Sequence, residues 1–307
     1  MKIAILGYGT VGSGCAEALK GSSAELARVL DKRDIPEISH LLTDDYDTIL
    51  KDPEIELVAE LMGGEHPAYD FVKMALLAGK HVVTANKQML SHHFSELTDL
   101  AKEKGLCLEY SATAGGGIPW LENLKRYSRV DSIKEIGGVM NGTTNFILDA
   151  MQSRGESYED ALRKAQELGY AEADPTADVM GYDVRAKLAI SCNIAFGGEL
   201  DPESIPTTGI TGITDETVKC AKESGMSVRL VAKAYLENGN IKAEIAPQLV
   251  GQDSPMYMLK GPENLFYLTG ERCGTLSFRG AGAGKGPTGA NVAADILKII
   301  DRKEQHA

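Results

Sequence analysis

The chain has 307 residues, of which 43% are hydrophobic and 25% charged, the usual balance of a soluble globular protein with room for two domains. Its formal net charge of −12 argues against nucleic acid or an anionic membrane as the main partner, although solubility alone accounts for such acidity. No apolar run reaches the roughly 18 residues that a membrane-spanning helix needs.

The start of the chain and its cysteines indicate the compartment. The opening MKIAILGYG does not have the layout of a signal peptide, because its apolar run is short and leads straight into glycines. The cysteines are odd in number, widely spaced and without a CxxC pair, which favours reduced thiols in the cytoplasm over disulfides or a zinc site. They are Cys15, Cys107, Cys192, Cys220 and Cys273.

The first expected strand, residues 2–6, ends in a glycine-rich motif. GYGTVG occupies residues 7–12 and precedes an apolar pattern at helical spacing, which is the arrangement of dinucleotide-binding proteins. Gly7 permits a tight turn, Gly9 lets the backbone approach a pyrophosphate, and Gly12 allows the helix to pack on the strand. The phosphates would lie at the helix N-terminus. The candidate cofactor-binding residues are therefore Gly7, Gly9, Thr10, Val11 and Gly12.

The second strand is expected at residues 26–31 and carries contradictory signals for the cofactor. An acid at this strand end, here Asp31, would hold ribose hydroxyls and favour NAD. The adjacent Lys32 and Arg33 would favour the 2′-phosphate of NADP. A solvated charged turn is the plain alternative. We prefer NADP but leave NAD open.

The next elements alternate between strand and helix, which predicts a parallel sheet. Strands are expected at residues 55–61 and 81–83, and between them residues 67–79 begin with Pro and stop at Gly like a helix. Ligands of such sheets lie beyond the carboxyl ends of the strands. Lys87 falls at one of these ends, where it is either a ligand-binding residue or a surface lysine.

A glycine run and a polar turn follow. After a helix at about 93–104 and a strand at 106–110, three glycines at 115–117 indicate close approach or unusual dihedral angles, unless they form a mobile turn. A strand at 132–140 then leaves the first domain. Asn141-Gly142 would give a turn, and Thr143 or Thr144 would cap the next helix.

The rest of the second domain is expected to be an antiparallel sheet with helices on one face. Helices are predicted at 157–169 and 214–225, and Asn238-Gly239 predicts a hairpin turn. A sheet with one covered face leaves the other for a second copy, which indicates a dimer. The expected strands are 227–237, 241–250, 264–269 and 275–280, and a glycine-rich loop at 280–288 precedes a final helix at 291–300.

The segment 167–187 concentrates charge before a buried helix. It holds five carboxylates. Residues 182–196 are largely apolar and predict a helix buried on most faces, and the part of the segment that precedes this helix is expected to be an ordered loop. Lys187 lies on that helix, one turn after Asp183. A buried lysine needs a partner or a task. The pair is therefore either an ordinary helix salt bridge or part of a site in which Lys187 donates a proton.

At this point the chain resembles a known family. The pattern Gly169-Tyr170-x-Glu172-x-Asp174-Pro175, followed by Asp178, Gly181, Asp183 and Lys187, is similar to the substrate segment of homoserine dehydrogenases, which reduce aspartate 4-semialdehyde to homoserine with NAD(P)H. The segments ELMGG…GKHVVTANK, Gly-Ile-Pro, NGTTN-F-I-L and GAGxGxxPT also resemble that family, in the same order. The resemblance extends over residues 1 to about 300.

The resemblance implies roles for particular residues. Lys187 would donate the proton, with Asp183 orienting it and, together with Glu172, holding the substrate ammonium; Asp178 would support the loop or bind the amino acid. Lys87 would bridge cofactor and substrate. Further implied contacts are Gly169, Tyr170 and Thr143 for the substrate, and Thr84 and Gly284 for the cofactor.

The family also binds a monovalent cation through backbone carbonyls and a glutamate. The corresponding carbonyls here are those of Ala114, Gly116 and Ile118, but Ser111 stands where the family has the glutamate. The cation site is therefore an expectation that this chain supports only through its backbone.

We therefore predict an α/β protein with two domains. Residues 1–130 with 286–307 would form a Rossmann-type doubly wound NAD(P)-binding domain, and residues 131–285 an α/β substrate-binding and dimerisation domain. The implied function is homoserine dehydrogenase activity in threonine, methionine and isoleucine biosynthesis. The alternatives are a reductase of a related amino-acid semialdehyde and a non-catalytic dinucleotide-binding dimer. Many relatives continue into a regulatory ACT domain, and we expect a short form without it.

Overall fold

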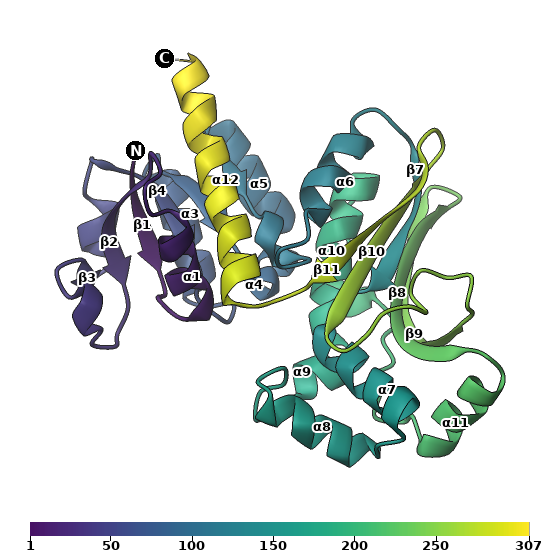
Figure 1. Cartoon of the computed structure of the whole chain (residues 1–307). Helices are drawn as coiled ribbons and strands as arrows, with labels where there is room; N and C mark the ends of the chain where they lie inside the picture. Colours follow the sequence, from purple (N-terminus) through teal and green to yellow (C-terminus); the bar gives the residue numbers. More distant parts are fainter. Residues whose placement is uncertain (307) are drawn as a thin grey trace. The chain divides into compact units, whose positions relative to one another are not determined.

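A computed structural model describes residues 1–306 and divides the chain into two compact units (Figure 1). One unit combines Met1–Gly117 with the chain from Ala283 onward, and the other is Ile118–Gly282. The chain therefore leaves the first unit once and returns to it for its final helix. No helix within the described residues is long and apolar enough to cross a membrane.

The first unit is built on a parallel six-stranded sheet with the order β3-β2-β1-β4-β5-β6. The order reverses between β1 and β4, which is the switch point at which doubly wound sheets bind dinucleotides. The Rossmann-type prediction is thus confirmed. The strands are β1 (Lys2–Leu6), β2 (Glu25–Leu30), β3 (Leu42–Thr43), β4 (Ile55–Glu60), β5 (His81–Thr84) and β6 (Leu108–Glu109).

Helices accompany this sheet, and its central strands are buried. Ile3 and Ile5 of β1 and Leu57 of β4 are fully buried and share a core with Val292 and Ile296 of the C-terminal helix. Strands covered on both faces read as continuous apolar runs, as KIAIL does. The helical elements are α1 (Thr10–Ala18), η1 (Pro36–Ile38), α2 (Asp47–Leu50), α3 (Ala68–Leu77), α4 (Lys87–His92), α5 (Phe94–Glu103), η2 (Ser111–Thr113) and α12 (Lys285–His306).

Helix α12, yellow in Figure 1, begins six residues earlier than predicted and lies against α1. The predicted loop at 280–288 is helical from Lys285 onward, because Pro287 is the third residue of the helix, where no intrahelical N–H bond is lost. Its glycines permit a close helix crossing. A Cβ at Gly289 would lie 2.5 Å from the carbonyl carbon of Gly14.

The second unit contains an antiparallel sheet with the order β11-β10-β7-β8-β9. Asn238 and Gly239 have φ values of 52° and 80°, so the predicted tight hairpin turn between β8 and β9 is confirmed. The strands are β7 (Ile133–Val139), β8 (Ser227–Glu237), β9 (Asn240–Val250), β10 (Glu263–Gly270) and β11 (Gly274–Ala281).

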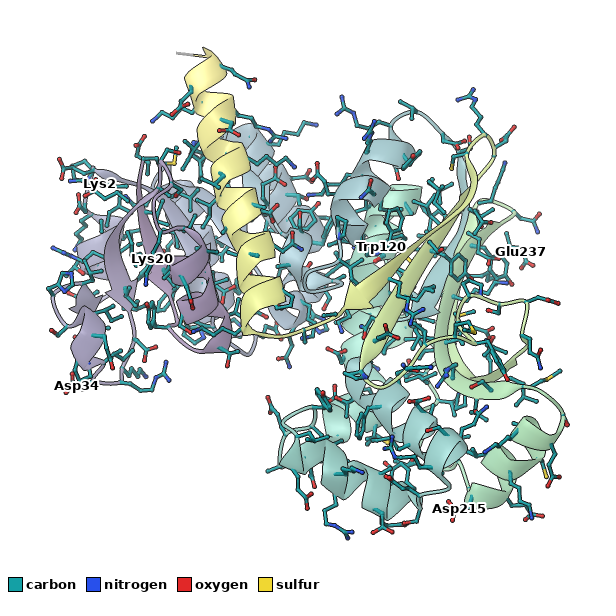
Figure 2. All side chains as sticks on the ribbon, in the orientation of Figure 1. Lys2, Lys20, Asp34, Trp120, Asp215 and Glu237 are labelled. Atoms are coloured by element: carbon teal, nitrogen blue, oxygen red, sulfur yellow. The ribbon has the colours of Figure 1, made fainter. Side chains whose placement is uncertain are left out.

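Helices pack on this sheet around a buried tryptophan. Trp120 is fully buried, stacks on Phe266 at 5.3 Å between ring centroids, and donates its indole N–H to Ser191 at 2.9 Å (Figure 2). The indole therefore joins helix, sheet and a second helix in one core. The helical elements are α6 (Trp120–Ser128), α7 (Gly142–Arg154), α8 (Tyr158–Glu167), α9 (Thr176–Val179), α10 (Tyr182–Phe196), η3 (Pro202–Ser204) and α11 (Asp215–Glu223).

Three local expectations were wrong. Neither Thr143 nor Thr144 caps α7: the cap is Asn141, whose side chain accepts the N–H of Thr144 at 2.8 Å. The segment between Gly169 and Gly181 is not only loop, because it contains the single turn α9. The expected strand at 106–110 is reduced to the two residues of β6.

The prediction overlooked α4 and α6. Helix α6 packs against α10 and β10 in the second unit, so the chain changes unit after Gly117, whereas the sequence analysis had placed that boundary after residue 130.

Candidate active site

The glycine turn after β1 has the geometry that its spacing predicts. Gly7 has φ +90°, and a Cβ there would lie 2.9 Å from the carbonyl oxygen of Leu61. A Cβ at Gly12 would overlap the carbonyl oxygen of Gly7. Gly9 differs, because no described atom lies within 4 Å of its Cβ position. Gly7 and Gly12 are thus required by the fold, while Gly9 leaves the backbone open at the start of α1, whose first residues are Thr10 and Val11.

At the end of β2, Asp31 and Arg33 form an ion pair. These are the two residues whose charges gave opposite indications for NAD and NADP in the sequence. Asp31 Oδ2 accepts the N–H of Tyr8 at 2.8 Å, and both of its oxygens accept from the guanidinium of Arg33, at 2.9 and 2.7 Å. The hydrogen bonds from Arg33 hold the pKa of the Asp31 carboxyl well below its usual range. The Asp31 side chain is 9% exposed and that of Arg33 is 61% exposed. The accessible group at this strand end is therefore the cation.

A buried carboxylate that the sequence analysis did not single out lies at the end of β4. Glu60 is fully buried and accepts hydrogen bonds from Thr84 Oγ1 at 2.5 Å and from the N–H of Met62 at 2.8 Å. Burial raises the pKa of its carboxyl to about 7. Thr84 is also fully buried, so its hydroxyl bonds to protein. The run IELVAEL contains two acids, and the signal that could have revealed Glu60 is its place at the end of the strand, directly after three apolar residues.

Lys87 is the first residue of α4, directly after the cap residue Asn86. The side chain of Asn86 accepts the N–H of Met89 at 3.0 Å, and Lys87 itself is half-buried. This places the lysine at the carboxyl end of β5, at the edge where a doubly wound sheet binds its cofactor.

Helix α12 is hydrogen-bonded to residues of the segment where a cation was expected. Asn291 Nδ2 donates to the carbonyl oxygen of Gly116 at 2.6 Å. Ser111 donates its backbone N–H and its hydroxyl to the two oxygens of Asp295, both at 2.8 Å. Ala114 is buried in the same unit, whereas Ile118 begins the second unit. Protein groups therefore already bond the segment that the resemblance assigned to an ion.

Gly284 lies immediately before α12 with φ +121°, a conformation that favours glycine. Its carbonyl oxygen accepts the N–H of Thr288 at 3.0 Å, which begins the helix. In the structure this residue therefore helps to start α12. This role is in addition to the cofactor contact that the resemblance implies.

The second unit brings Lys187 and two carboxylates together. Lys187 is 7% exposed, and its Nζ donates to Asp183 Oδ2 at 2.6 Å and to the carbonyl oxygen of Met140 at 2.8 Å. Asn141 Nδ2 donates to the same oxygen of Asp183 at 2.8 Å and to Asp178 Oδ1 at 2.7 Å. The lysine is therefore buried and paired, as its position on an apolar helix predicted.

The surroundings of Asp178 disfavour the ionised form of its carboxyl. Its Oδ2 accepts the hydroxyl of Thr143 at 3.2 Å, and that hydroxyl also bonds the carbonyl oxygen of Tyr170 at 2.5 Å. Burial and, after it, the negative charge of Asp183 raise the pKa of the Asp178 carboxyl above its ordinary value. With Lys187 charged, two carboxylates and one ammonium leave this cluster with a net negative charge.

The remaining predicted substrate residues lie on the segment after α8. Gly169, with φ +75°, ends that helix and leads to Tyr170, whose ring lies 5.1 Å from that of Phe146. The side chain of Glu172 is exposed, and its backbone carbonyl oxygen accepts a hydrogen bond from Gln166 Nε2 at 3.1 Å. The structure thus joins Thr143, Tyr170, Asp178, Asp183 and Lys187, but it does not bring the Glu172 carboxylate to them.

The protein belongs to the class of NAD(P)-dependent oxidoreductases that act on a CH–OH group. The strand order and the open glycine turn fit a dinucleotide, and the buried lysine among carboxylates fits proton transfer to an oxygen. Comparison with known proteins gives the family. The family model described as "Homoserine dehydrogenase" matches residues 119–297, and the one described as "Homoserine dehydrogenase, NAD binding domain" matches residues 7–111. The chain belongs to the homoserine dehydrogenase family.

Individual relatives agree over nearly the whole chain. The homoserine dehydrogenase of Lactococcus lactis is 37% identical over 99% of this chain and 75% of its own. A crystal structure of a homoserine dehydrogenase from Thiobacillus denitrificans has a TM-score of 0.92 at 35% identity, over 97% of this chain and 73% of its own. A hyperthermophilic archaeal homoserine dehydrogenase in complex with NADPH has a TM-score of 0.84 at 25% identity, over 98% of each chain.

Proposed function

We propose that the protein catalyses the reversible NAD(P)H-dependent reduction of L-aspartate 4-semialdehyde to L-homoserine. The observation that carries this proposal is the buried Lys187, held 2.6 Å from Asp183 Oδ2 in a cluster of net negative charge. An ordinary surface salt bridge would contribute little and would not need burial. A buried ammonium beside a carboxylate is instead suited to proton transfer and to stabilising an alkoxide.

The nicotinamide supplies the hydride, and the protein supplies the proton. In reduction, a C–H bond forms at the aldehyde carbon and the oxygen becomes an alkoxide. Lys187 Nζ stabilises that charge and donates a proton to the oxygen. Asp183 and the carbonyl oxygen of Met140 fix the direction of Nζ. In oxidation the neutral amine removes the hydroxyl proton.

The carboxylates account for recognition of an amino acid. The substrate carries an ammonium group, and Asp178 and Asp183 offer it more negative charge than Lys187 neutralises. Asn141 fixes both carboxylates from one amide nitrogen. We propose that Glu172, whose side chain is exposed, offers a further carboxylate to the ammonium group. Lys87 is proposed to lie between the cofactor and the substrate and to contact both.

We propose NADP(H) as the preferred cofactor. Asp31 is occupied by Tyr8 and Arg33, so it cannot accept ribose hydroxyls without releasing them. Arg33 is exposed and held in place, which suits a 2′-phosphate. The archaeal relative was solved in complex with NADPH, which supports a nicotinamide dinucleotide as the cofactor.

Replacing Arg33 tests the cofactor preference. In Arg33→Ala we expect the ratio of kcat/KM for NADP to that for NAD to fall by about tenfold or more, roughly 1.4 kcal/mol. The phosphate loses its cation, and Asp31 becomes free to accept ribose hydroxyls. Initial rates with each cofactor give the ratio. Lys20→Ala removes an exposed lysine of the same unit that is not at this strand end, and it is the matched control. An unchanged ratio in the Arg33 variant would contradict the preference.

The function itself is tested by nicotinamide absorbance with L-homoserine and either NADP or NAD at alkaline pH. We expect reduction with homoserine and none with L-serine or L-threonine. Folded protein that binds NADPH without oxidising homoserine would favour a reductase of another semialdehyde or a non-catalytic binding protein.

We propose that the reaction needs no monovalent cation, because Asn291 already bonds Gly116 and Asp295 already bonds Ser111 in the segment assigned to the ion. The rate should therefore be equal in KCl and in the chloride of a bulky organic cation.

We further propose a homodimer formed through the second unit. Ile136 and Leu268 lie on the face of its sheet that packs in the core, and residues alternate between the faces of a strand. On the other face, Glu135 accepts from Lys233 at 2.9 Å and from Tyr267 Oη at 2.8 Å. A monomer mass in sedimentation would contradict the dimer.

All five cysteines are free thiols, which favours the reducing cytoplasm as the compartment.

A further inference from the structure

Glu60 joins the ends of two neighbouring strands. Its Oε1 accepts from the N–H of Met62 at 2.8 Å and from Asn86 Nδ2 at 3.4 Å, and its Oε2 accepts from Thr84 Oγ1 at 2.5 Å. Met62 lies just after β4, whereas Thr84 and Asn86 lie at the end of β5. One buried carboxylate therefore links both chain segments at the carboxyl edge of the sheet.

Asn86 carries this link into helix α4. Its Nδ2 also donates to the carbonyl oxygen of Gly64 at 2.7 Å, and its Oδ1 caps the helix at the N–H of Met89. The next residue is Lys87. The position of the lysine at the first turn of α4 therefore depends on Asn86, and through it on Glu60.

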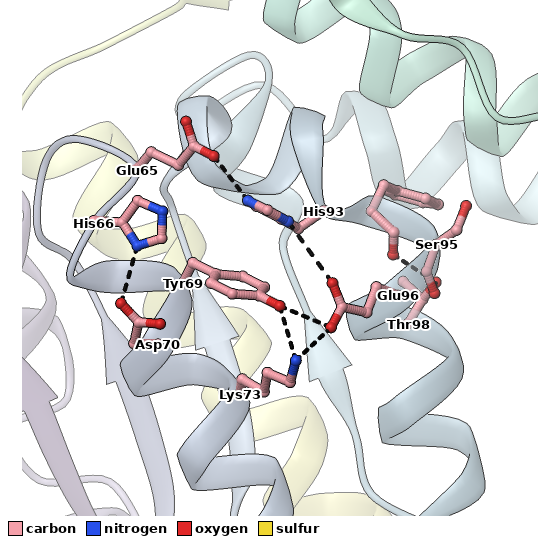
Figure 3. Close-up of polar contacts among 10 residues, drawn as sticks. Glu65, His66, Tyr69, Asp70, Lys73, His93, Ser95, Glu96 and Thr98 are labelled. Atoms are coloured by element: carbon pink, nitrogen blue, oxygen red, sulfur yellow. Dashed lines mark hydrogen bonds and ion pairs between the residues drawn. The ribbon is translucent and has the colours of Figure 1, made fainter.

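The other end of α4 is tied to the same segment after β4 (Figure 3). His93 follows the helix, and its Nε2 is hydrogen-bonded to Glu65 Oε1 at 2.8 Å. The imidazole stacks on the ring of Tyr69 at 3.9 Å between centroids, and Tyr69 Oη and Lys73 Nζ both donate to Glu96 at 2.7 Å. Helix α4 is thus held at both ends against residues 62–65.

Burying the Glu60 carboxylate at the end of a strand costs desolvation free energy. The partners of Glu60 are neutral donors, and an apolar residue of similar volume would avoid the desolvation of a charge. What the carboxylate provides is three directed hydrogen bonds to two segments. The carboxylate therefore serves to fix the geometry of the segments at the carboxyl ends of β4 and β5.

We propose that Glu60 is a positioning residue of the cofactor edge, which orders residues 62–64 and the start of α4 and so sets the position of Lys87. The inference rests on the proposed function only in that this edge receives the cofactor. Glu60 acts through Thr84 and Asn86.

The ionisation of Glu60 gives this proposal a pH signature. Burial raises the pKa of its carboxyl from 4.5 to about 7. Between these values the folded protein binds a proton that the unfolded chain has released, so the contribution of this group to stability falls as pH rises through that window. The direct partners of Glu60 do not titrate, and the titratable pair on the segment after β4 is Glu65 with His93. Glu60→Gln removes the titration of Glu60 alone.

The test is amide hydrogen exchange of the cofactor-free protein. In Glu60→Gln we expect exchange at residues 62–64 and 86–90 to be about tenfold faster, because Gln presents a donor where Thr84 needs an acceptor. We also expect the Kd for NADPH to rise by about tenfold. The melting temperature of the variant relative to wild type should increase from pH 5 to pH 8, since only the wild type carries the titrating group.

Glu109→Gln is the matched control. Glu109 is a buried carboxylate on β6 that pairs with Lys298 and Arg302, and its loss should lower stability without changing exchange in those segments. If Glu60→Gln does not fold, Thr84→Val removes one donor and should show the same pattern to a smaller extent. Wild-type exchange and NADPH affinity in the folded variant would overturn the proposal. Loosened segments in the variant, together with a wild-type protein that does not oxidise homoserine, would overturn the proposed reaction and leave the role of Glu60 standing.

Discussion

The Lys187→Ala variant is expected to oxidise homoserine about two orders of magnitude more slowly than the wild type, or worse, because it lacks the group that we propose as general base and acid. The dissociation constant for NADPH should stay unchanged, since the glycine turn and Arg33 lie in the other unit. Steady-state kcat and NADPH fluorescence measure the two quantities. Separate values are needed because a loss of kcat alone identifies a role in the chemical step.

A control on the same helix separates chemistry from stability. Arg185 pairs with Glu203, away from the cluster around Lys187. Arg185→Ala should therefore change the melting temperature modestly and leave kcat within about twofold of wild type. Removing Lys187 leaves Asp183 without its ammonium partner, so circular dichroism must first show that the variant folds. Near-normal turnover in folded Lys187→Ala would exclude the assigned role.

The glycine motif should separate folding from cofactor binding. In Gly12→Ala the new methyl group overlaps the carbonyl oxygen of Gly7, so we expect a loss of about 3 kcal/mol and a melting temperature lower by roughly 10 °C. In Gly9→Ala the methyl group meets no described atom within 4 Å, so the melting temperature should change little. The Kd for NADPH should nevertheless rise by about tenfold or more, because the methyl group obstructs the approach of the pyrophosphate.

Thermal denaturation and NADPH titration of the two variants check this expectation. Gly212→Ala is the matched control, because Gly212 also has open space around its Cβ position and lies in the other unit. It should alter neither quantity. Unchanged NADPH affinity in Gly9→Ala would show that the cofactor does not approach the backbone there, and an unchanged melting temperature in Gly12→Ala would contradict the packing of α1 on β1.

The alternation of elements and the glycine motif were readable from the sequence, because each is encoded by residues close together in the chain. The apolar run of β1 is followed at once by Gly7, and the helix at 182–196 was predicted with the bounds that α10 has in the structure. Lys187 could be singled out for the same reason: a lysine on a continuous apolar helix is conspicuous without knowledge of what surrounds it.

Only the tertiary structure decided which groups meet. Asn141 bonds Asp178 and Asp183, which lie 37 and 42 residues further along the chain, and Ser111 bonds Asp295 across 184 residues. Glu60 likewise meets Asn86 only because β4 and β5 are neighbours in the sheet. Such pairings depend on strand order and helix packing rather than on local periodicity, so a sequence pattern names the residue types while the fold selects their partners.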